Sequence, residues 1–209
     1  MKRFLIVATL VMFADLSLVA QAPKGWKVRA DRSTSATDPD AAGTIKFATS
    51  GSGFHATTPQ AAVFWNPANT ATGNYSLKGT FTLMKPSGHT NYYGLVFGGS
   101  DLEGPKQSYL YFLVAQDGTW LVKRREGNVA TQNIATSAAA AVKKPDASGK
   151  STNALEVRVT PKGTEYLVNG TTVHTEPRTG PAAKTDGLFG IRVNHQLEVH
   201  IDGFGLSKS

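Results

Sequence analysis

The last stretch of the sequence carries three polar residues whose types suit acid–base chemistry or metal binding. Glu198, His200 and Asp202 alternate with aliphatic residues. Because successive side chains of a strand point to opposite faces, all three would project from one face. Two carboxylates and an imidazole can hold a metal ion or act as general acid and base. A half-exposed strand also needs polar residues on its solvent face, and we favour this structural interpretation for the row.

A second group combines aromatic rings with polar side chains in the middle of the chain. It consists of Tyr92, Tyr93, Gln107, Tyr109, Tyr111, Trp120 and Arg124. Aromatic faces offer area on which a ligand can stack, and polar tips fix its orientation. Most of these rings would be core residues in a two-layer sandwich, so we expect at most two or three of them at a ligand. His89 in a loop and His195 in a turn are further candidate ligand contacts, because imidazole titrates near neutral pH.

A glycine-rich loop supplies the candidate metal ligands. Asp101 and Glu103 lie within residues 98–105, directly after an aromatic segment. Their carboxylates could ligate calcium or accept hydrogen bonds from sugar hydroxyls. Calcium sites need more oxygen donors than this loop displays, so a connecting loop with surface acids is the favoured alternative. The sequence shows no other cofactor motif, and calcium is the one cofactor that we consider.

The composition excludes several classes of protein. The chain has 209 residues and no cysteine, which excludes disulfide-stapled miniproteins, thiolate zinc sites and cysteine nucleophiles. A nucleophilic serine elbow, a phosphate-binding loop and a dinucleotide fingerprint are also missing from the sequence. Lysine and arginine (22) exceed aspartate and glutamate (15), but the cations are scattered, with one run of three at Lys123-Arg124-Arg125. Phosphate tracking needs a continuous basic stripe, so we expect no nucleic-acid partner.

The N-terminus predicts export. A basic start, an apolar run over Phe4–Phe13 and the small-residue stretch Ala20-x-Ala22 are typical of a secretory signal peptide at residues 1–22. No later segment is apolar for long enough to span a membrane. We expect residues 23–209 to be one domain, exported to a bacterial periplasm or secreted, because a domain of this size can bury enough apolar surface to fold without disulfides.

Period-two alternation dominates the body of the chain and predicts thirteen strands. They are expected at Trp26–Ala30, Thr44–Thr49, Gly53–Thr57, Ala62–Trp65, Tyr75–Met84, Tyr92–Phe97, Ser108–Ala115, Trp120–Arg125, Leu155–Thr160, Glu165–Val168, Thr172–His174, Leu188–Val193 and Leu197–Leu206. Asp117-Gly118 and Asn169-Gly170 supply tight hairpin turns. Many short strands without a βαβ rhythm indicate an all-β, antiparallel sandwich. One short helix is expected at residues 137–144, where an alanine run follows Ser137 and Pro145 stops it.

The segment Ser108–Ala115 differs from the other strands because both of its faces are apolar or aromatic. Tyr109 and Tyr111 lie on one face, and Phe112 lies on the other. This pattern indicates a central strand whose second face is covered or forms a cleft.

Several segments, taken in order, carry a resemblance to a known superfamily. They are Tyr75–Met84, Tyr93–Gly99, Tyr109–Val114, Gly118–Lys123, Asn153–Val159, Tyr166–Gly170, Gly187–Val193 and Val199–Phe204. This order resembles the concanavalin A-like lectin/glucanase superfamily, and most of all its small exported bacterial domains near the 3-keto-disaccharide hydrolase (domain of unknown function 1080) and laminin-G-like groups. The resemblance implies a jelly-roll sandwich with a concave face and an association with carbohydrate. The clustered Glu-x-Asp-x-x-Glu strand of the laminarinase-like hydrolases is missing.

Three functional hypotheses follow. The first is a noncatalytic, lectin-like module that holds carbohydrate or a cell-envelope polysaccharide on a concave aromatic face. The second is a 3-keto-glycoside hydrolase or lyase of the same fold, with Glu198, His200 and Asp202 as its catalytic candidates. The third is a noncatalytic envelope interaction domain that binds no small ligand.

Overall fold

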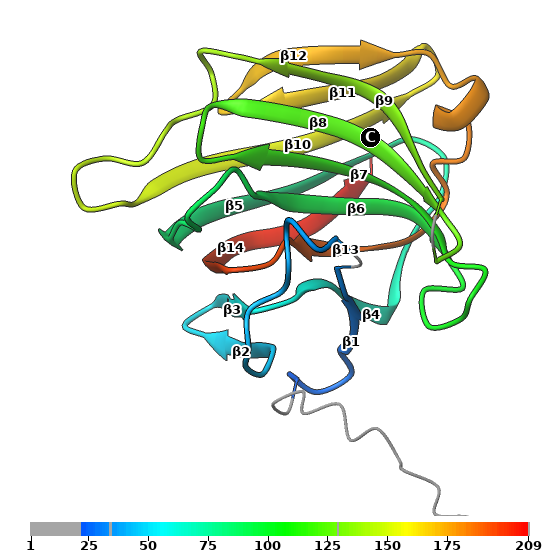
Figure 1. Ribbon diagram of the computed structural model, residues 1–209. Coiled ribbons are helices and arrows are strands. Elements are labelled where there is room, and N and C mark those ends of the chain that lie inside the picture. Colours follow the sequence, from blue (N-terminus) through cyan, green and yellow to red (C-terminus); the bar gives the residue numbers. More distant parts are fainter. Residues whose placement is uncertain (1–21, 34, 129, 209) are drawn as a thin grey trace, which may run out of the picture.

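The computed structural model describes residues 22–33, 35–128 and 130–208. Two seven-stranded antiparallel sheets pack face to face, as Figure 1 shows. Sheet A has the strand order β1-β4-β13-β6-β7-β8-β9, and sheet B has the order β12-β11-β10-β5-β14-β3-β2. The strands are β1 (Lys27–Asp31), β2 (Lys46–Ser50), β3 (Gly53–Thr58), β4 (Ala61–Ala71), β5 (Tyr75–Lys85), β6 (Tyr92–Ser100), β7 (Ser108–Ala115), β8 (Thr119–Glu126), β9 (Ala130–Ala138), β10 (Ser151–Thr160), β11 (Gly163–Val168), β12 (Thr171–Glu176), β13 (Gly187–Val193) and β14 (Leu197–Lys208).

The predicted all-β sandwich is confirmed, and so are its hairpin turns. Asp117-Gly118 joins β7 to β8, with Gly118 at φ +91°. Asn169 and Gly170 join β11 to β12 with φ values of +50° and +80°. Two consecutive positive φ angles suit the right-handed twist of a two-residue hairpin, and asparagine followed by glycine adopts them at the lowest cost.

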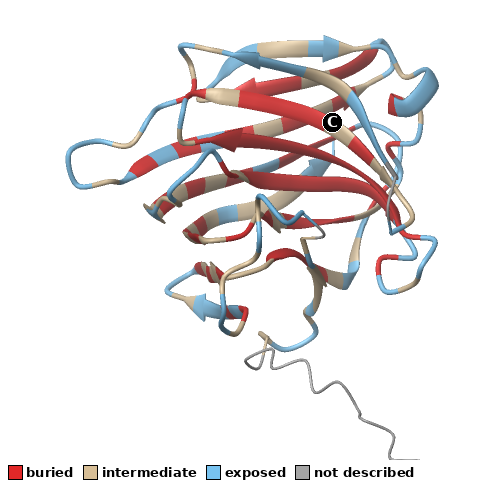
Figure 2. Cartoon of the chain, in the orientation of Figure 1, coloured by how far each residue is buried: buried red, intermediate tan, exposed pale blue. Residues whose placement is uncertain are grey.

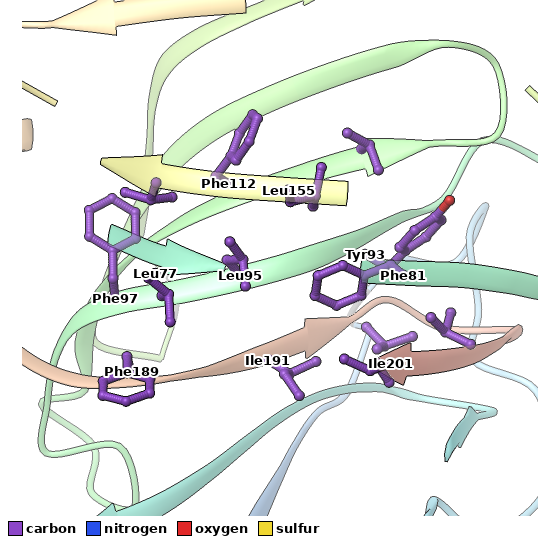
Figure 3. Packing of buried hydrophobic residues seen from close by; sticks show 14 of the residues in the cluster. Leu77, Phe81, Tyr93, Leu95, Phe97, Phe112, Leu155, Phe189, Ile191 and Ile201 are labelled. Carbon is purple, nitrogen blue, oxygen red and sulfur yellow. The ribbon is translucent and has the colours of Figure 1, made fainter. Parts of the chain in front are cut away.

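The main core lies between the two sheets. Phe81 from sheet B packs near Tyr93 from sheet A, with ring centroids 6.1 Å apart, and aliphatic side chains of both sheets surround the pair (Figure 3). Phe112 of β7 contacts Tyr166 of β11 in the same layer, at 5.2 Å between ring centroids. The buried residues run along the middle strands of both sheets (Figure 2).

Sheet A carries a second apolar layer on its outer face. Every residue of β7 is buried, which confirms the prediction of a central strand with two apolar faces. The outer layer consists of Val63, Trp65, Val96, Leu102, Tyr109, Tyr111, Leu113 and Leu121. Leu102 comes from the loop between β6 and β7, so this loop folds back over the face.

The predicted helix at residues 137–144 is wrong. The segment instead continues strand β9 to Ala138 and then forms a turn, and Val142 is buried in the main core. The Asn153 side chain bonds both the backbone N–H and the C=O of Lys143, at 2.8 and 3.0 Å. Eight residues are too few to hold a helix by propensity alone, so pairing with β8 and these contacts decide the conformation. Within the described ranges, the only helical element is the three-residue 3₁₀ turn η1 (Gly180–Ala182).

The predicted signal peptide at residues 1–22 falls almost wholly on residues 1–21, which lie outside the described residues. In the part of the chain that is described, no helix has the length and apolar character needed to span a membrane.

Candidate functional site

The sequence candidates separate onto two faces of sheet A. Tyr93 and Trp120 point into the main core between the sheets, where they are at most 4% exposed. Arg124 lies on the same inner side, at the end of the sandwich. Its Nη2 donates to Ser108 Oγ at 2.5 Å, and its Nε pairs with Glu126. These three residues therefore do not share a surface with Tyr109 and Tyr111, which lie on the outer face.

On the outer face, polar groups from four strands form one cluster, which we call the arginine–tyrosine network. Its members are Arg29 and Asp31 of β1, Tyr109 and Tyr111 of β7, Arg125 of β8 and Arg192 of β13. Arg192 is its centre. Its Nη1 donates to Tyr109 Oη at 2.8 Å and to Asp31 Oδ2, and Tyr109 Oη donates to the same carboxylate oxygen at 3.2 Å. The guanidinium carbon of Arg192 lies 5.4 Å from the centroid of the Tyr111 ring, a cation–π contact.

The Asp31–Arg192 ion pair is buried, because the two side chains are only 7% and 11% exposed. Burial alone would raise the pKa of Asp31. The positive charge of Arg192 and its hydrogen bond outweigh burial, together with the charge of Arg125 and the hydrogen bond from Tyr109, and hold that pKa below its usual value. Asp31 is therefore ionised at neutral pH and fixes the guanidinium in place.

Arg29 and Arg125 connect the network to the loops at one end of the sheet. Arg29 Nη1 donates to the carbonyl oxygens of Leu102 and Gly104, at 3.1 and 2.8 Å, and Nη2 donates to Asn128 Oδ1 at 2.7 Å. Arg125 Nε donates to the carbonyl oxygen of Gly127 at 2.7 Å. The Gln107 amide, also a sequence candidate, is buried beside Arg29, within hydrogen-bonding distance (2.9 Å) of its Nη2. These contacts hold the β6–β7 loop and the β8–β9 loop against the outer face of sheet A.

The outer face presents cations to solvent rather than bare aromatic rings. Tyr109 is fully buried and Tyr111 is 7% exposed, so neither ring offers a wide stacking surface. Lys123 and Arg125 are half-buried, and they stand opposite the exposed Asn133 and Thr131 of the edge strand β9. The aromatic platform expected from the sequence is thus covered, and charge and hydrogen bonding are what the face offers.

Sequence reasoning missed Arg29, Asp31, Arg125 and Arg192 as site residues. Arg192 did leave a signal, because it is a lone charge between Ile191 and Val193 in an otherwise apolar strand. Its partner Asp31 is 161 positions away, so no local pattern relates the two.

Glu198, His200 and Asp202 project from the outer face of sheet B. Each carboxylate contacts a histidine at 3.1 Å, Glu198 with His55 of β3 and Asp202 with His200. Glu198 also lines a pocket of about 500 Å³, in which Lys46 is another charged residue. The two carboxylates are 37% and 47% exposed, so they face solvent, and each has a histidine partner.

Asp101 and Glu103 use their carboxylates for different purposes. Asp101 has φ +49°, and its Oδ2 accepts the backbone N–H of Lys106 at 3.1 Å, which closes the loop. Glu103 points away to an ion pair with Lys27 of β1. The structure does not test calcium binding by this loop, which the sequence allowed beside the favoured interpretation of a connecting loop.

The structure brings His89 and His195 together, with Asp38 as a third member that the sequence did not indicate. Asp38 Oδ1 lies 2.8 Å from His89 Nε2 and 3.1 Å from His195 Nε2, and the two nitrogens are 3.1 Å apart. Among the described residues, this is the only set of three histidine, aspartate or glutamate ligand atoms that converges within 4.8 Å.

Comparison with known proteins places the fold. No protein-family model matches the chain, and no curated protein sequence matches it. Among solved structures, the carbohydrate binding module CBM66 from Bacillus subtilis matches with a TM-score of 0.60 at 13% identity, over 88% of this chain and 96% of that chain. A Bacillus subtilis protein of unknown function with a galectin-like fold gives 0.60 at 14% identity, over 88% and 90%. The fold is a jelly-roll β-sandwich.

A third match to this jelly roll is alginate lyase A1-II′, with a TM-score of 0.53 at 12% identity, over 88% of this chain and 95% of that chain. Identities this low establish the fold alone. They confirm the jelly roll that the sequence resemblance implied, and they leave the ligand to be argued from the side chains of this chain.

Proposed function

We propose that the chain is an exported carbohydrate-binding module that holds an anionic glycan on the outer face of sheet A. The observation that carries the proposal is the arginine–tyrosine network, in which three arginines surround a single carboxylate, Asp31. Lys123 of β8 lies directly opposite Tyr111 of β7, and Arg125 lies directly opposite Tyr109, so both cations are on the same face as the network. The jelly-roll fold, which it shares with a carbohydrate binding module, supports the proposal.

The chemistry of the face suits an acidic sugar better than a neutral one. Arginine binds a carboxylate through two parallel N–H bonds, and such charge-assisted bonds are about twice as strong as neutral ones. Asp31 is already neutralised by Arg192, so it leaves the charges of Arg125 and Lys123 for a ligand. The buried Tyr111 helps to hold Arg192 in position, because the guanidinium lies over the Tyr111 ring. A glycan of uronate residues would place a carboxylate at each repeat.

We prefer this function to the hydrolase or lyase alternative because of where the catalytic candidates lie. Glu198 and Asp202 are each paired with a histidine on the outer face of sheet B, remote from the network on sheet A. The third hypothesis, an envelope interaction domain, predicts no glycan binding and is therefore an outcome of the binding experiment.

Isothermal titration against polyuronates, neutral glucans and fructans tests the proposal. We expect saturable binding to a polyuronate that weakens as salt rises, because screening reduces exposed charge interactions. Lys123→Ala and Arg125→Gln should each weaken it about tenfold, the loss expected for one charge-assisted hydrogen bond. Lys78→Ala, on the outer face of sheet B, is the matched control and should not change the affinity. Absence of binding to every glycan would overturn the proposal and favour the interaction domain.

Export has its own test. The full chain with its native N-terminus is expressed in a bacterium with a periplasm, and the mass of the recovered protein is measured. We expect a product that has lost a segment ending at or near Ala20 or Ala22, since both follow the small-residue pattern of a cleavage site. If the uncleaved chain is recovered only from the cytoplasm, export is contradicted. The proposal of glycan binding does not depend on this result.

A further inference from the structure

We propose that Asp38, His89 and His195 bind a divalent transition-metal ion of the zinc class. The site lies where three loops meet, namely residues 35–40, the β5–β6 connection and the β13–β14 turn. It is separate from the arginine–tyrosine network and does not depend on the proposed function. His195 is buried, with 7% of its side chain exposed, whereas Asp38 (49%) and His89 (42%) are open to solvent, so an ion can enter.

The distances suit a tetrahedral ion. Zinc binds imidazole nitrogen and carboxylate oxygen at about 2.0–2.1 Å, so two ligand atoms of a tetrahedron lie about 3.3 Å apart. The three ligand atoms form a triangle with edges of 2.8, 3.1 and 3.1 Å. An outward movement of a few tenths of an ångström at each side chain would place an ion above this triangle, with water as the fourth ligand.

The surrounding hydrogen bonds aim lone pairs at the same point. His195 Nδ1 lies 3.1 Å from Asp40 Oδ1, which makes Nδ1 the protonated nitrogen and leaves the lone pair of the neutral ring on Nε2. Asp40 is itself held, because its Oδ2 accepts the backbone N–H of Ser33 at 2.8 Å. A carboxylate behind a histidine is the usual support of a zinc ligand, since it fixes the ring and raises its basicity.

His89 differs from His195, because the side chain that supports it contacts Nε2 and not Nδ1. The Asn91 side-chain amide donates to His89 Nε2 at 3.0 Å, so this nitrogen also carries a lone pair. An ion would replace Asn91 as the partner of that lone pair. The cluster therefore sets two imidazole lone pairs and one carboxylate oxygen face to face, an arrangement that repels itself unless a cation lies between the groups.

The donor set identifies the class of metal. Two imidazoles and one carboxylate suit zinc and the neighbouring transition metals, whereas calcium and magnesium take oxygen ligands. The bound ion would tie the segment that holds Asp38 to the two loops that hold the histidines. All three loops lie outside the sheets, so the protein is expected to fold without metal and to be stabilised by it.

The test uses the untagged chain, treated with a chelator and then titrated with Zn²⁺ in a calorimeter. We expect one ion per chain and, at about a hundredfold excess over the dissociation constant, a rise in Tm of about 5–10 °C. Co²⁺ should bind at the same site with the intense visible absorption of a tetrahedral complex. His89→Ala and His195→Ala should abolish both signals, and Asp40→Asn should weaken binding about 10–100-fold.

His200→Ala is the matched control, because His200 lies on sheet B and contacts a carboxylate at the same 3.1 Å distance. It should leave the metal signals unchanged. His89 is exposed, so His89→Ala remains folded even if replacing the buried His195 does not. The proposal is overturned if the native chain takes up no Zn²⁺ or if His89→Ala binds it as tightly as the native chain.

Discussion

Replacing Arg192 with methionine tests whether the network is held by its buried ion pair. Methionine keeps much of the apolar stem of arginine but removes the guanidinium, so Asp31 stays in a site where only 7% of its side chain is exposed. Removing one partner of a buried pair costs about 3–5 kcal/mol. Tyr109 still donates to the carboxylate, Arg29 Nε stays 3.7 Å from Asp31 Oδ1 and the charge of Arg125 remains near it, so we expect the low end, about 3 kcal/mol at pH 7.

The cost should depend on pH with a definite sign. In the native chain the pKa of Asp31 is lowered, so its stabilising contribution is present above the unfolded pKa, about 3.9, and is lost as the pH falls through the lower folded value. In Arg192→Met the largest lowering cause is gone, so we expect the remaining effect of burial to raise the folded pKa of Asp31. Protonation then favours the folded variant as the pH falls, so the difference from the native chain shrinks below about pH 5.

Urea unfolding followed by tryptophan fluorescence at pH 4.5 and pH 8 measures both effects. The double variant Asp31→Asn with Arg192→Met should be more stable than Arg192→Met alone, because no charge is left buried. Arg158→Met is the control, since Arg158 makes partly exposed pairs on sheet B and should cost less than about 1 kcal/mol. A loss below 1 kcal/mol in Arg192→Met at pH 8, or an equal loss at both pH values, would refute the argument.

Two further predictions concern the frame around the site. Gly98→Ala should lower the free energy of unfolding in urea by about 1–3 kcal/mol more than Gly51→Ala does. Both glycines have φ near +60°, but only a Cβ at Gly98 would meet a backbone oxygen, that of Lys184 at 2.4 Å. Equal costs would contradict the predicted clash. Asn153→Ala should lower the free energy of unfolding by about 1–3 kcal/mol and speed hydrogen exchange at residues 139–146, because it leaves the backbone of Lys143 without its partner. Unchanged hydrogen exchange at these residues would contradict this prediction.

The sequence predicted which residues within a single strand share a face. Alternation within Ser108–Ala115 assigned Tyr109 and Phe112 to opposite faces, and the structure confirms this assignment. The prediction that aromatic rings of different strands share one face was wrong, because it requires the pairing register between those strands. Val114 stands opposite Tyr93 on β6 and opposite Trp120 on β8, so both rings share its inward face. Counting outward from the Asp117-Gly118 hairpin turn could have placed Trp120.

The edge strand β9 was missed for a different reason. Its sequence is polar and alanine-rich, Ala-Thr-Gln-Asn-Ile-Ala-Thr-Ser-Ala, and most of its residues are exposed. Pairing with β8 holds this strand in the sheet, so it does not need hydrophobic alternation, and the sequence shows none. The alanines then favoured helix by intrinsic propensity, and tertiary pairing outweighed that propensity.

Both polar clusters on sheet A and its loops include an ion pair between the same two parts of the chain. The N-terminal segment supplies Asp31 to Arg192 and, seven residues later, Asp38 to His195. Arg192 and His195 lie at the end of β13 and in the turn that follows it. A metal ion at Asp38 would therefore restrain the segment that carries Asp31, although the two sites bind different chemical groups. Neither contact could be predicted from local pattern, because each joins residues more than 150 positions apart, and this distance explains why the sequence indicated the histidines and tyrosines but not the acids that organise them.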